Sequence, residues 1–444
     1  MHYSTISETV KRKYERKFVS AQEAVSVIQS GDRVYIHPGC AVPQVLVDAM
    51  VGRYEELHNV EVCHLLGVGD AAYVRPEMQG HFRHNAFFIG KNVRKAVNEG
   101  RADFTPIFLS EIPALLLSRD YSVDIALIQV SPPDEHGFCS FGVGVECTKA
   151  ATEVAKVVVA QVNPNMPRTL GDSFIHISRI DYCVEVNVPL MELPQLEGDE
   201  TPEELEVYRK IGENVASLVD DGSTLQLGIG RIPDSVVKSL EDHRHLGVHT
   251  EMISDGIIPL VESGVITNQK KTLLPGKIVT SFVLGSHELF DFIDNNPSME
   301  FRPTQFTNDP FTIARNRKMV AINSAIEIDL TGQVCADSMG YKFYSGFGGQ
   351  LDFIRGAARS EGGKPIIALP STAKNGAVSR ITKGLREGGG VTTSRGDVHY
   401  VVTEYGVVNL HGRTVRQRVE LLISIAHPNF KEELERCAKE QHYL

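Results

Sequence analysis

Short apolar runs bounded by turn residues recur through the first half of the chain, and stretches with helical spacing separate them. The apolar runs lie at residues 33–36, 60–63, 123–128 and 155–160. The helical patterns include residues 43–50 and 93–98. Short apolar strands that alternate with helices are typical of a mostly parallel sheet with both faces covered. The pattern therefore predicts an α/β fold.

A polar stretch interrupts this pattern near the middle of the chain. Residues 189–200 contain two prolines, a glycine and several acidic residues, with little apolar periodicity. Thr201-Pro202-Glu203-Glu204 then supplies an N-cap, a proline for the first helical position and a capping-box glutamate. Because 444 residues exceed what one hydrophobic core usually supports, we expect two domains, at 1–190 and 203–444, joined by a linker at 191–202.

Two sequence patterns occur in both halves, in the same order. The first joins a strand, a glycine turn and a proline-led helix, at 31–46 and again at 222–236. The second is a turn with an aspartate and a glycine, followed by a cysteine, at 134–139 and again at 329–335. Such repeats indicate duplicated domains of similar topology. A cleft between paired domains is then the expected place for a site.

Composition argues against several classes of protein. Hydrophobic residues make up 42% of the chain and charged residues 23%, and no segment approaches the ~18 apolar residues of a membrane span. The N-terminus leads into the charged run at 11–17, so we expect no secretory signal and a cytoplasmic protein. A net charge of −11 argues against a nucleic-acid partner. The seven cysteines lack C-x-x-C spacing, so we expect reduced thiols and no metal site.

Two glycine-rich segments could present backbone N–H groups to a ligand. Residues 228–233 (Gly-Ile-Gly-Arg-Ile-Pro) follow a strand and open a helix, where N–H groups can point at an anion. They lack the third glycine of a dinucleotide-binding fingerprint and are equally compatible with a tight strand–helix turn. Residues 345–353 contain three glycines in four positions, which favours an oxyanion or cofactor contact and is also compatible with a structural turn.

Between these segments lies Glu251, in a polar stretch at 249–256 that separates two apolar runs. A carboxylate at the end of a strand, near loops rich in free amides, is placed for nucleophilic or acid–base chemistry. Most acidic residues of a protein are simply solvated. Position alone therefore does not distinguish Glu251 from the other acids.

Three segments together do distinguish it. Residues 228–233, the motif His249-Thr250-Glu251-Met252 with Ser254-Asp255-Gly256, and residues 346–353 resemble the acetyl-CoA hydrolase/transferase family of class I CoA-transferases in order, spacing and sequence. Within this family the resemblance is to 4-hydroxybutyrate and butyryl-CoA:acetate CoA-transferases. It extends into the first half of the chain through residues 92–97, 108–113 and 130–137, and so covers nearly the whole sequence.

The resemblance implies a fold of two similar open α/β domains, coenzyme A as substrate and product, and a glutamyl-CoA thioester formed on Glu251. It implies that one loop for CoA consists of Gly228, Ile229, Gly230, Arg231 and Ile232. It also implies that Ser345 and Gly349 lie on a second loop that contacts CoA.

Further roles follow from the same resemblance. The amides of Ile232 and Gly349 would form an oxyanion hole, and Asn308 would orient the substrate. Asn308-Asp309-Pro310 is also compatible with an ordinary turn. Candidates for the CoA phosphates are Arg355, Arg359 and Lys374.

The expected reaction is ping-pong exchange of CoA between acetyl-CoA, or another short-chain acyl-CoA, and 4-hydroxybutyrate, butyrate or acetate. No metal is expected, and a homodimer is the default assembly. Two alternatives stay open, an acetyl-CoA hydrolase in which water intercepts the intermediate and a non-catalytic acyl-CoA-binding module. A nicotinamide dehydrogenase is disfavoured because the dinucleotide fingerprint is incomplete.

Overall fold

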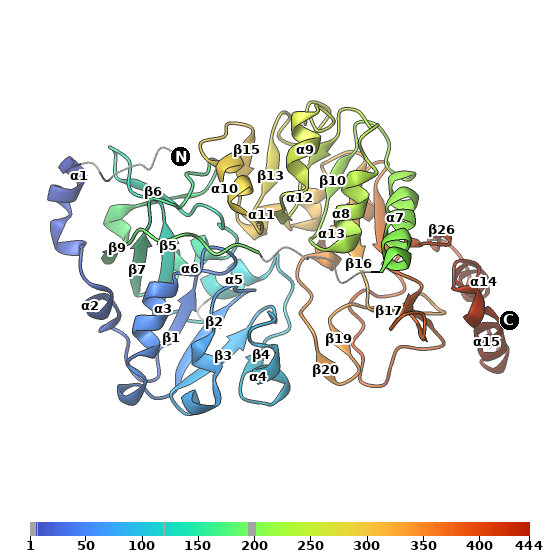
Figure 1. Cartoon of the computed structure of the whole chain (residues 1–444), viewed down its shortest axis with the longest axis horizontal. Helices are drawn as coiled ribbons and strands as arrows, with labels where there is room; N and C mark the ends of the chain where they lie inside the picture. Colours follow the sequence, from blue (N-terminus) through green and yellow to red (C-terminus); the bar gives the residue numbers. More distant parts are fainter. Residues whose placement is uncertain (1–5, 7, 119, 194–200) are drawn as a thin grey trace. The chain divides into compact units, whose positions relative to one another are not determined.

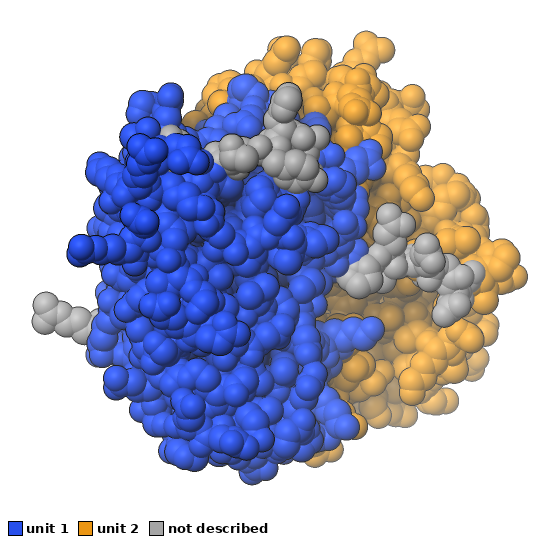
Figure 2. Space-filling model, turned by 60° about the vertical axis from the view of Figure 1, so that its left-hand side comes forward, with its two compact units in different colours: residues 1–194, 279–307 blue, residues 195–278, 308–444 orange. Residues whose placement is uncertain are grey.

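The computed structural model describes residue 6 and residues 8–118, 120–193 and 201–444, and they form two compact units. Unit 1 consists of Met1–Pro194 and Val279–Thr307, and unit 2 of Gln195–Ile278 and Asn308–Leu444; Figure 2 colours them blue and orange. Residues 279–307, which the sequence analysis assigned to the second domain, thus belong to unit 1. Phe301 holds this segment there, because its N–H and C=O exchange hydrogen bonds with Leu170 and Asp172 at 2.8 Å each. Most of the expected linker, residues 194–200, lies outside the described residues.

Unit 1 contains a parallel sheet of seven strands (Figure 1), in the order β4-β3-β2-β1-β5-β7-β9. The strands are β1 (Arg33–Ile36), β2 (Val60–His64), β3 (Phe82–Ala86), β4 (Asp103–Phe104), β5 (Ile125–Val130), β7 (Val157–Val162) and β9 (Tyr182–Glu185). The helices of this unit include α2 (Ala21–Val25), α3 (Gln44–Val51), α4 (Arg94–Asn98), α5 (Ile112–Leu117), α6 (Thr148–Val154), α10 (His287–Ile293) and α11 (Thr304–Thr307).

Alternate residues of β1 face two separate hydrophobic cores of unit 1. Val34 and Ile36 belong to a core with residues of α2 and α3, whereas Tyr35 belongs to a second core with residues of α5 and α6. Both faces of the sheet are therefore covered, as the uninterrupted apolar runs predicted.

The sheet of unit 2 has six strands in the order β11-β10-β16-β21-β25-β26, and only the pairing of β25 with β26 is antiparallel. The strands are β10 (Thr224–Gln226), β11 (Gly247–Val248), β16 (Met319–Ser324), β21 (Lys364–Ala368), β25 (Tyr400–Thr403) and β26 (Gly406–Asn409). The helices include α7 (Pro202–Ala216), α8 (Arg231–Lys238), α9 (Ile257–Glu262), α12 (Pro310–Ile313), α13 (Gln350–Arg359), α14 (Val415–Ser424) and α15 (Pro428–Glu440).

The predicted capping box is present at the start of α7. The Thr201 side chain accepts a hydrogen bond from the Glu204 backbone N–H, and the Glu204 carboxylate accepts one from the Thr201 N–H. These two bonds satisfy N–H groups that a helix start leaves without intrahelical partners.

The repeat seen in the sequence corresponds to a repeat in topology. The order β2-β1-β5-β7-β9 in unit 1 matches β11-β10-β16-β21-β25 in unit 2. The turns match as well, because Asp134 Oδ1 accepts from the N–H groups two and four residues later, and Asp329 Oδ1 does the same. Gly137 and Gly332 follow with φ of 89° and 94°, a conformation that favours glycine.

Two expectations from composition can be compared with the structure. All seven cysteines are free thiols, as expected, and the structure buries six of them. Within the part of the chain that the structure describes, no helix has the length and apolar character needed to cross a bilayer.

Candidate active site

Two neighbouring strands of unit 2 deliver the central segments to one edge of the sheet. Strands β10 and β11 are parallel, with Leu225 opposite Val248. The glycine loop at 228–230 follows β10, and His249-Thr250-Glu251 follows β11, before the short strand β12 (Met252–Ile253). Because parallel strands end at the same edge, the two loops lie next to each other where α/β proteins commonly bind ligands.

The Thr250 hydroxyl ties these two loops together. It lies 3.2 Å from the carbonyl oxygen of Leu227, next to the glycine loop, and 3.0 Å from that of Met252, beyond Glu251. Thr250 is fully buried and lines, with Gly228 and Ser254, the same small cavity. No role is predicted for Thr250 from the sequence, although its place beside Glu251 within the motif is an available signal.

Two of the expected residues contact the Glu251 carboxylate. Asn308 Nδ2 donates a 2.8 Å hydrogen bond to Glu251 Oε2, and the backbone N–H of Gly349 also hydrogen-bonds this carboxylate. A Cβ atom at position 349 would overlap both Glu251 Oε2 and Asn308 Nδ2. Glycine is therefore required here for space, since its φ of −100° is open to any residue.

Helix α13 begins directly behind this contact. Gly349 is its N-cap residue, and the ring of Phe353 in its first turn packs edge-on against His249, with ring centroids 6.3 Å apart. The N-terminus of a helix favours negative charge because its N–H groups have no intrahelical partners. The start of α13 is thus suited to a carboxylate or an oxyanion.

Burial raises the pKa of Glu251 from its ordinary value to about 7, against the opposing effect of the Asn308 and Gly349 hydrogen bonds. The first effect penalises the charged form and the second stabilises it. Near neutral pH the group is therefore divided between acid and carboxylate. A carboxylate that is poorly solvated and held by two donors is a competent nucleophile.

The loop at 228–232 leads from β10 into helix α8. Gly230 precedes α8 with φ of 106°, which favours glycine, and the buried Ile232 lies in the first turn of the helix. N–H groups in a first helical turn are available to a ligand. Ile229 is exposed and Arg231 half-buried, so the loop is accessible from solvent.

Three further candidates have contacts of their own in unit 2. The Ser345 hydroxyl lies 3.5 Å from the Ala336 carbonyl oxygen, within its own loop. Arg355 forms an ion pair with Asp397, at 3.1 Å between Nε and Oδ1, and would share its charge with any phosphate. Arg359 donates to the Arg355 carbonyl.

Comparison with known proteins shows which family the chain resembles. The model of the acetyl-CoA hydrolase/transferase N-terminal domain matches residues 3–192, and that of the C-terminal domain matches residues 285–438. The chain is 53% identical to a 4-hydroxybutyrate coenzyme A transferase of Clostridium kluyveri, over 95% of this chain and 97% of that protein. It is 48% identical to a succinyl-CoA:acetate/propanoyl-CoA:succinate CoA transferase of Fasciola hepatica, over 94% of this chain and 87% of that protein.

Among solved structures, a 4-hydroxybutyrate CoA-transferase from Porphyromonas gingivalis superposes with a TM-score of 0.83 at 42% identity. The match covers 97% of this chain and 99% of that one. The similarity thus extends over both units, including residues 279–307 of unit 1.

Proposed function

The chain belongs to the acetyl-CoA hydrolase/transferase family and is a CoA-transferase, and we propose that it works through a covalent intermediate on Glu251. The observation that carries this proposal is the Glu251 carboxylate held by Asn308 and by the N–H of Gly349, with a pKa raised to about 7. Among the described acids, this group combines a raised pKa with a position beside two glycine loops.

In the proposed first half-reaction, a Glu251 oxygen attacks the carbonyl carbon of an acyl-CoA. The carbon–sulfur bond breaks, CoA leaves as thiolate, and an acyl-glutamyl anhydride forms. The thiolate then attacks the glutamyl carbonyl carbon, which releases the first acid as carboxylate and leaves glutamyl-CoA. A carboxylate nucleophile suits this exchange because its acyl product is as reactive as the substrate.

The second half-reaction runs these steps in reverse with another acid. The acceptor carboxylate attacks glutamyl-CoA, CoA leaves, and the thiolate attacks the acyl carbon of the new anhydride to give the new acyl-CoA and free Glu251. Each attack creates a tetrahedral oxyanion. We propose that the N–H groups of Gly349 and Ile232 stabilise it, since each such donor is typically worth about 10²–10³ in rate.

For CoA we propose the loop at 228–232 and the segment at 345–349 as ligands. The Gly230 turn and the first turn of α8 support the first assignment, and the position of Gly349 at the start of α13 supports the second. As acids we propose 4-hydroxybutyrate, butyrate and acetate. We also propose a homodimer in the cytoplasm, which light scattering on purified protein and cell fractionation test.

Hydrolysis of acyl-CoA is the main competing activity, because hydrolysis and CoA transfer differ only in whether water or an acid intercepts the intermediate. The relatives at 53% and 48% identity are named as transferases, which supports transfer.

The test measures CoA transfer from butyryl-CoA with and without added acetate. Transfer should depend on acetate and disappear in Glu251→Gln, whereas Glu262→Gln, a change at an exposed glutamate of α9, should keep the wild-type rate. CoA release independent of acetate would establish a hydrolase. Near-normal transfer by Glu251→Gln would refute the nucleophile.

A further inference from the structure

Both donors to the Glu251 carboxylate stand at the starts of helices of unit 2. Asn308 lies one residue before Asp309, the N-cap residue of α12, and Gly349 is the N-cap residue of α13. The Asp309 carboxylate accepts hydrogen bonds from the N–H and the hydroxyl of Thr312, at 2.8 and 2.7 Å, which fixes the chain directly after Asn308. The distance between the two donors therefore depends on how α12 and α13 pack.

These two helices lie side by side (Figure 1), and a glycine of α13 lets them touch. A Cβ atom at Gly356 would lie 2.4 Å from Cγ2 and 2.5 Å from Cβ of Ile313, the last residue of α12. Carbon atoms in contact are normally about 3.5–4.0 Å apart, so any side chain at Gly356 would push the helices apart by about 1 Å. Ile313 is fully buried and shares a core with Phe353 and Ala357 of α13.

The helix itself does not call for glycine at this position. Gly356 lies in the interior of α13 and has no positive φ, so any residue could adopt its backbone conformation. Glycine is a poor helix former, whereas alanine is the best. The close contact with Ile313 is therefore what the glycine provides.

The far end of the helix pair is tied by a hydroxyl group. Ser360, the C-cap residue of α13, donates from Oγ to the Asn316 carbonyl at 2.5 Å and accepts from the Met319 N–H at 3.1 Å. Because a helix rises about 1.5 Å per residue, Gly356 lies about 6 Å along the axis from Ser360, and Gly349 about 16 Å. If α13 turned about Ser360 as a rigid rod, a wedge of about 1 Å at Gly356 would open the pair by about 3 Å at Gly349.

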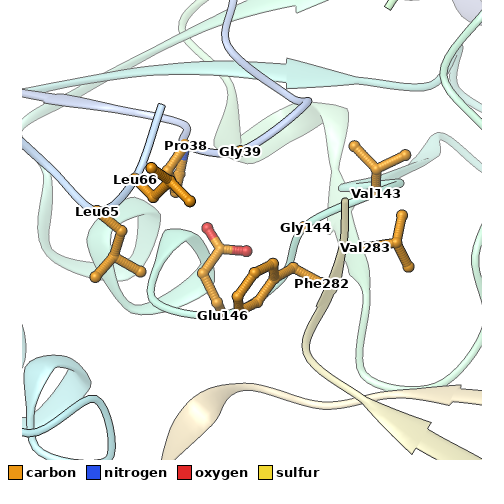
Figure 3. A pocket seen from close by; sticks show the side chains of 9 residues that line it. All are labelled: Pro38, Gly39, Leu65, Leu66, Val143, Gly144, Glu146, Phe282 and Val283. Atoms are coloured by element: carbon orange, nitrogen blue, oxygen red, sulfur yellow. The ribbon is translucent and has the colours of Figure 1, made fainter. Parts of the chain in front are cut away.

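A buried carboxyl group of unit 1 shows what such donors contribute. Glu146 lies among apolar side chains (Figure 3), where Oε1 accepts from the Thr148 hydroxyl at 2.7 Å and Oε2 has no hydrogen-bond partner within the described part of the chain. Burial raises the pKa of Glu146 to about 8, and that of Glu251, which has the Asn308 and Gly349 donors, to about 7. Each donor stabilises the charged form, so the loss of one from Glu251 should raise its pKa.

We propose that Gly356 is a positioning residue for CoA transfer, because it sets the distance between the two helices whose starts hold the nucleophile. A wider separation would take Asn308 Nδ2 from 2.8 Å out of hydrogen-bond range of Glu251 Oε2. Gly356 thus acts through other groups and not on the reacting atoms. In its consequence for catalysis the inference rests on the proposed function, whereas the hold on the carboxylate does not.

The experiment measures CoA transfer from butyryl-CoA to acetate by Gly356→Ala as a function of pH. We expect kcat/KM to fall about 10²-fold, the typical cost of misplacing a catalytic group by about 1 Å. The rising limb of the pH profile should move to higher pH, because the carboxylate loses a donor. Val419→Ala is the control, since it removes methyl groups from another core, at α14, and should lower stability without moving the limb.

The pKa of Glu251 is also measured without turnover, from the carbonyl stretch of its protonated carboxyl group in the infrared spectrum. The band is assigned by its loss in Glu251→Gln, and it should titrate at higher pH in Gly356→Ala. Ile313→Ala disturbs the same contact from α12 and should move the band in the same direction. The effects of the two changes should not add in the double variant, because both act on one contact.

The outcomes separate positioning from loss of stability. An unmoved pKa of Glu251 in Gly356→Ala, or in Ile313→Ala if the first variant does not fold, would overturn the inference, since any loss of activity would then come from a weakened fold. Additive effects in the double variant would overturn it as well. A raised pKa in protein whose wild type transfers no CoA would support the positioning and refute the proposed function.

Discussion

Replacing Gly349 by alanine tests whether the site depends on close approach of backbone to carboxylate. The added methyl group would occupy the space of Glu251 Oε2 and Asn308 Nδ2. Since all three groups belong to unit 2 and the methyl group would overlap both side chains, the Asn308 amide and the Glu251 carboxylate must shift to make room. The hydrogen bonds of the carboxylate to the Gly349 N–H and to Asn308 would then be lost or lengthened.

The size of the effect follows from what is displaced. Overpacking by one methyl group typically costs about 1–3 kcal/mol of stability, which a folded protein of this size tolerates. Loss of one donor to a developing oxyanion typically reduces the rate about 10²–10³-fold, and a misplaced nucleophile adds to that. We therefore expect Gly349→Ala to fold and to lose at least about 10²-fold in kcat/KM.

The assay is CoA transfer from butyryl-CoA to acetate, with the free energy of unfolding measured in parallel. Gly384→Ala is the control, because that glycine of unit 2 has open space around it and no positive φ. If Gly349→Ala retained activity within about twofold of Gly384→Ala, the required close contact of Gly349 with Glu251 would be refuted.

Three further predictions concern the surroundings of the site and the stability of unit 1. Asn308→Ala should raise the pKa of Glu251 above about 7, because the lost hydrogen bond stabilises the carboxylate; the rising limb of kcat/KM should move to higher pH, and an unmoved limb would contradict this. Thr250→Val should lower the transition-state stabilisation measured by kcat/KM and the free energy of unfolding by about 1 kcal/mol each, the typical contribution of one hydrogen bond. If neither quantity changed, the two loops would hold their positions without the Thr250 hydroxyl. Burial lowers the pKa of His64 to about 4 and that of His84 well below its ordinary value of 6.5, so both are neutral in the folded state. The stability contributed by the two neutral imidazoles is fully present above pH 6.5 and is lost as the pH falls toward 4, because the unfolded chain then binds protons that the folded protein does not. Between pH 7.5 and pH 5, the free energy of unfolding measured in urea should therefore fall less in His84→Phe than in the wild type.

Local patterns in the sequence predicted much of the fold. The strand at 33–36 has the predicted bounds, and the capping box at Thr201 and Glu204 starts α7 as expected, because both depend on neighbouring residues only. The exchange of residues 279–307 into unit 1 could not be predicted, since its cause is pairing of Phe301 with a segment about 130 residues earlier in the chain. No change in composition marks its ends.

For the site, too, some features could be predicted from the sequence and others depend on packing. Glu251 could be selected only through resemblance, because an acid at the end of a strand is common. The lack of space for a side chain at Gly349, and the contact of the Thr250 hydroxyl with the Leu227 carbonyl, depend on three-dimensional packing that residue spacing does not encode.

The central claim is a covalent intermediate on Glu251, and intact-protein mass spectrometry tests it most directly. Protein mixed with butyryl-CoA or acetyl-CoA is trapped with borohydride, weighed and mapped by peptide analysis. The account predicts a modification confined to the peptide that contains Glu251, absent from Glu251→Gln. An unmodified Glu251 in protein that demonstrably turns over acyl-CoA would contradict the account and make this residue a general base for direct hydrolysis.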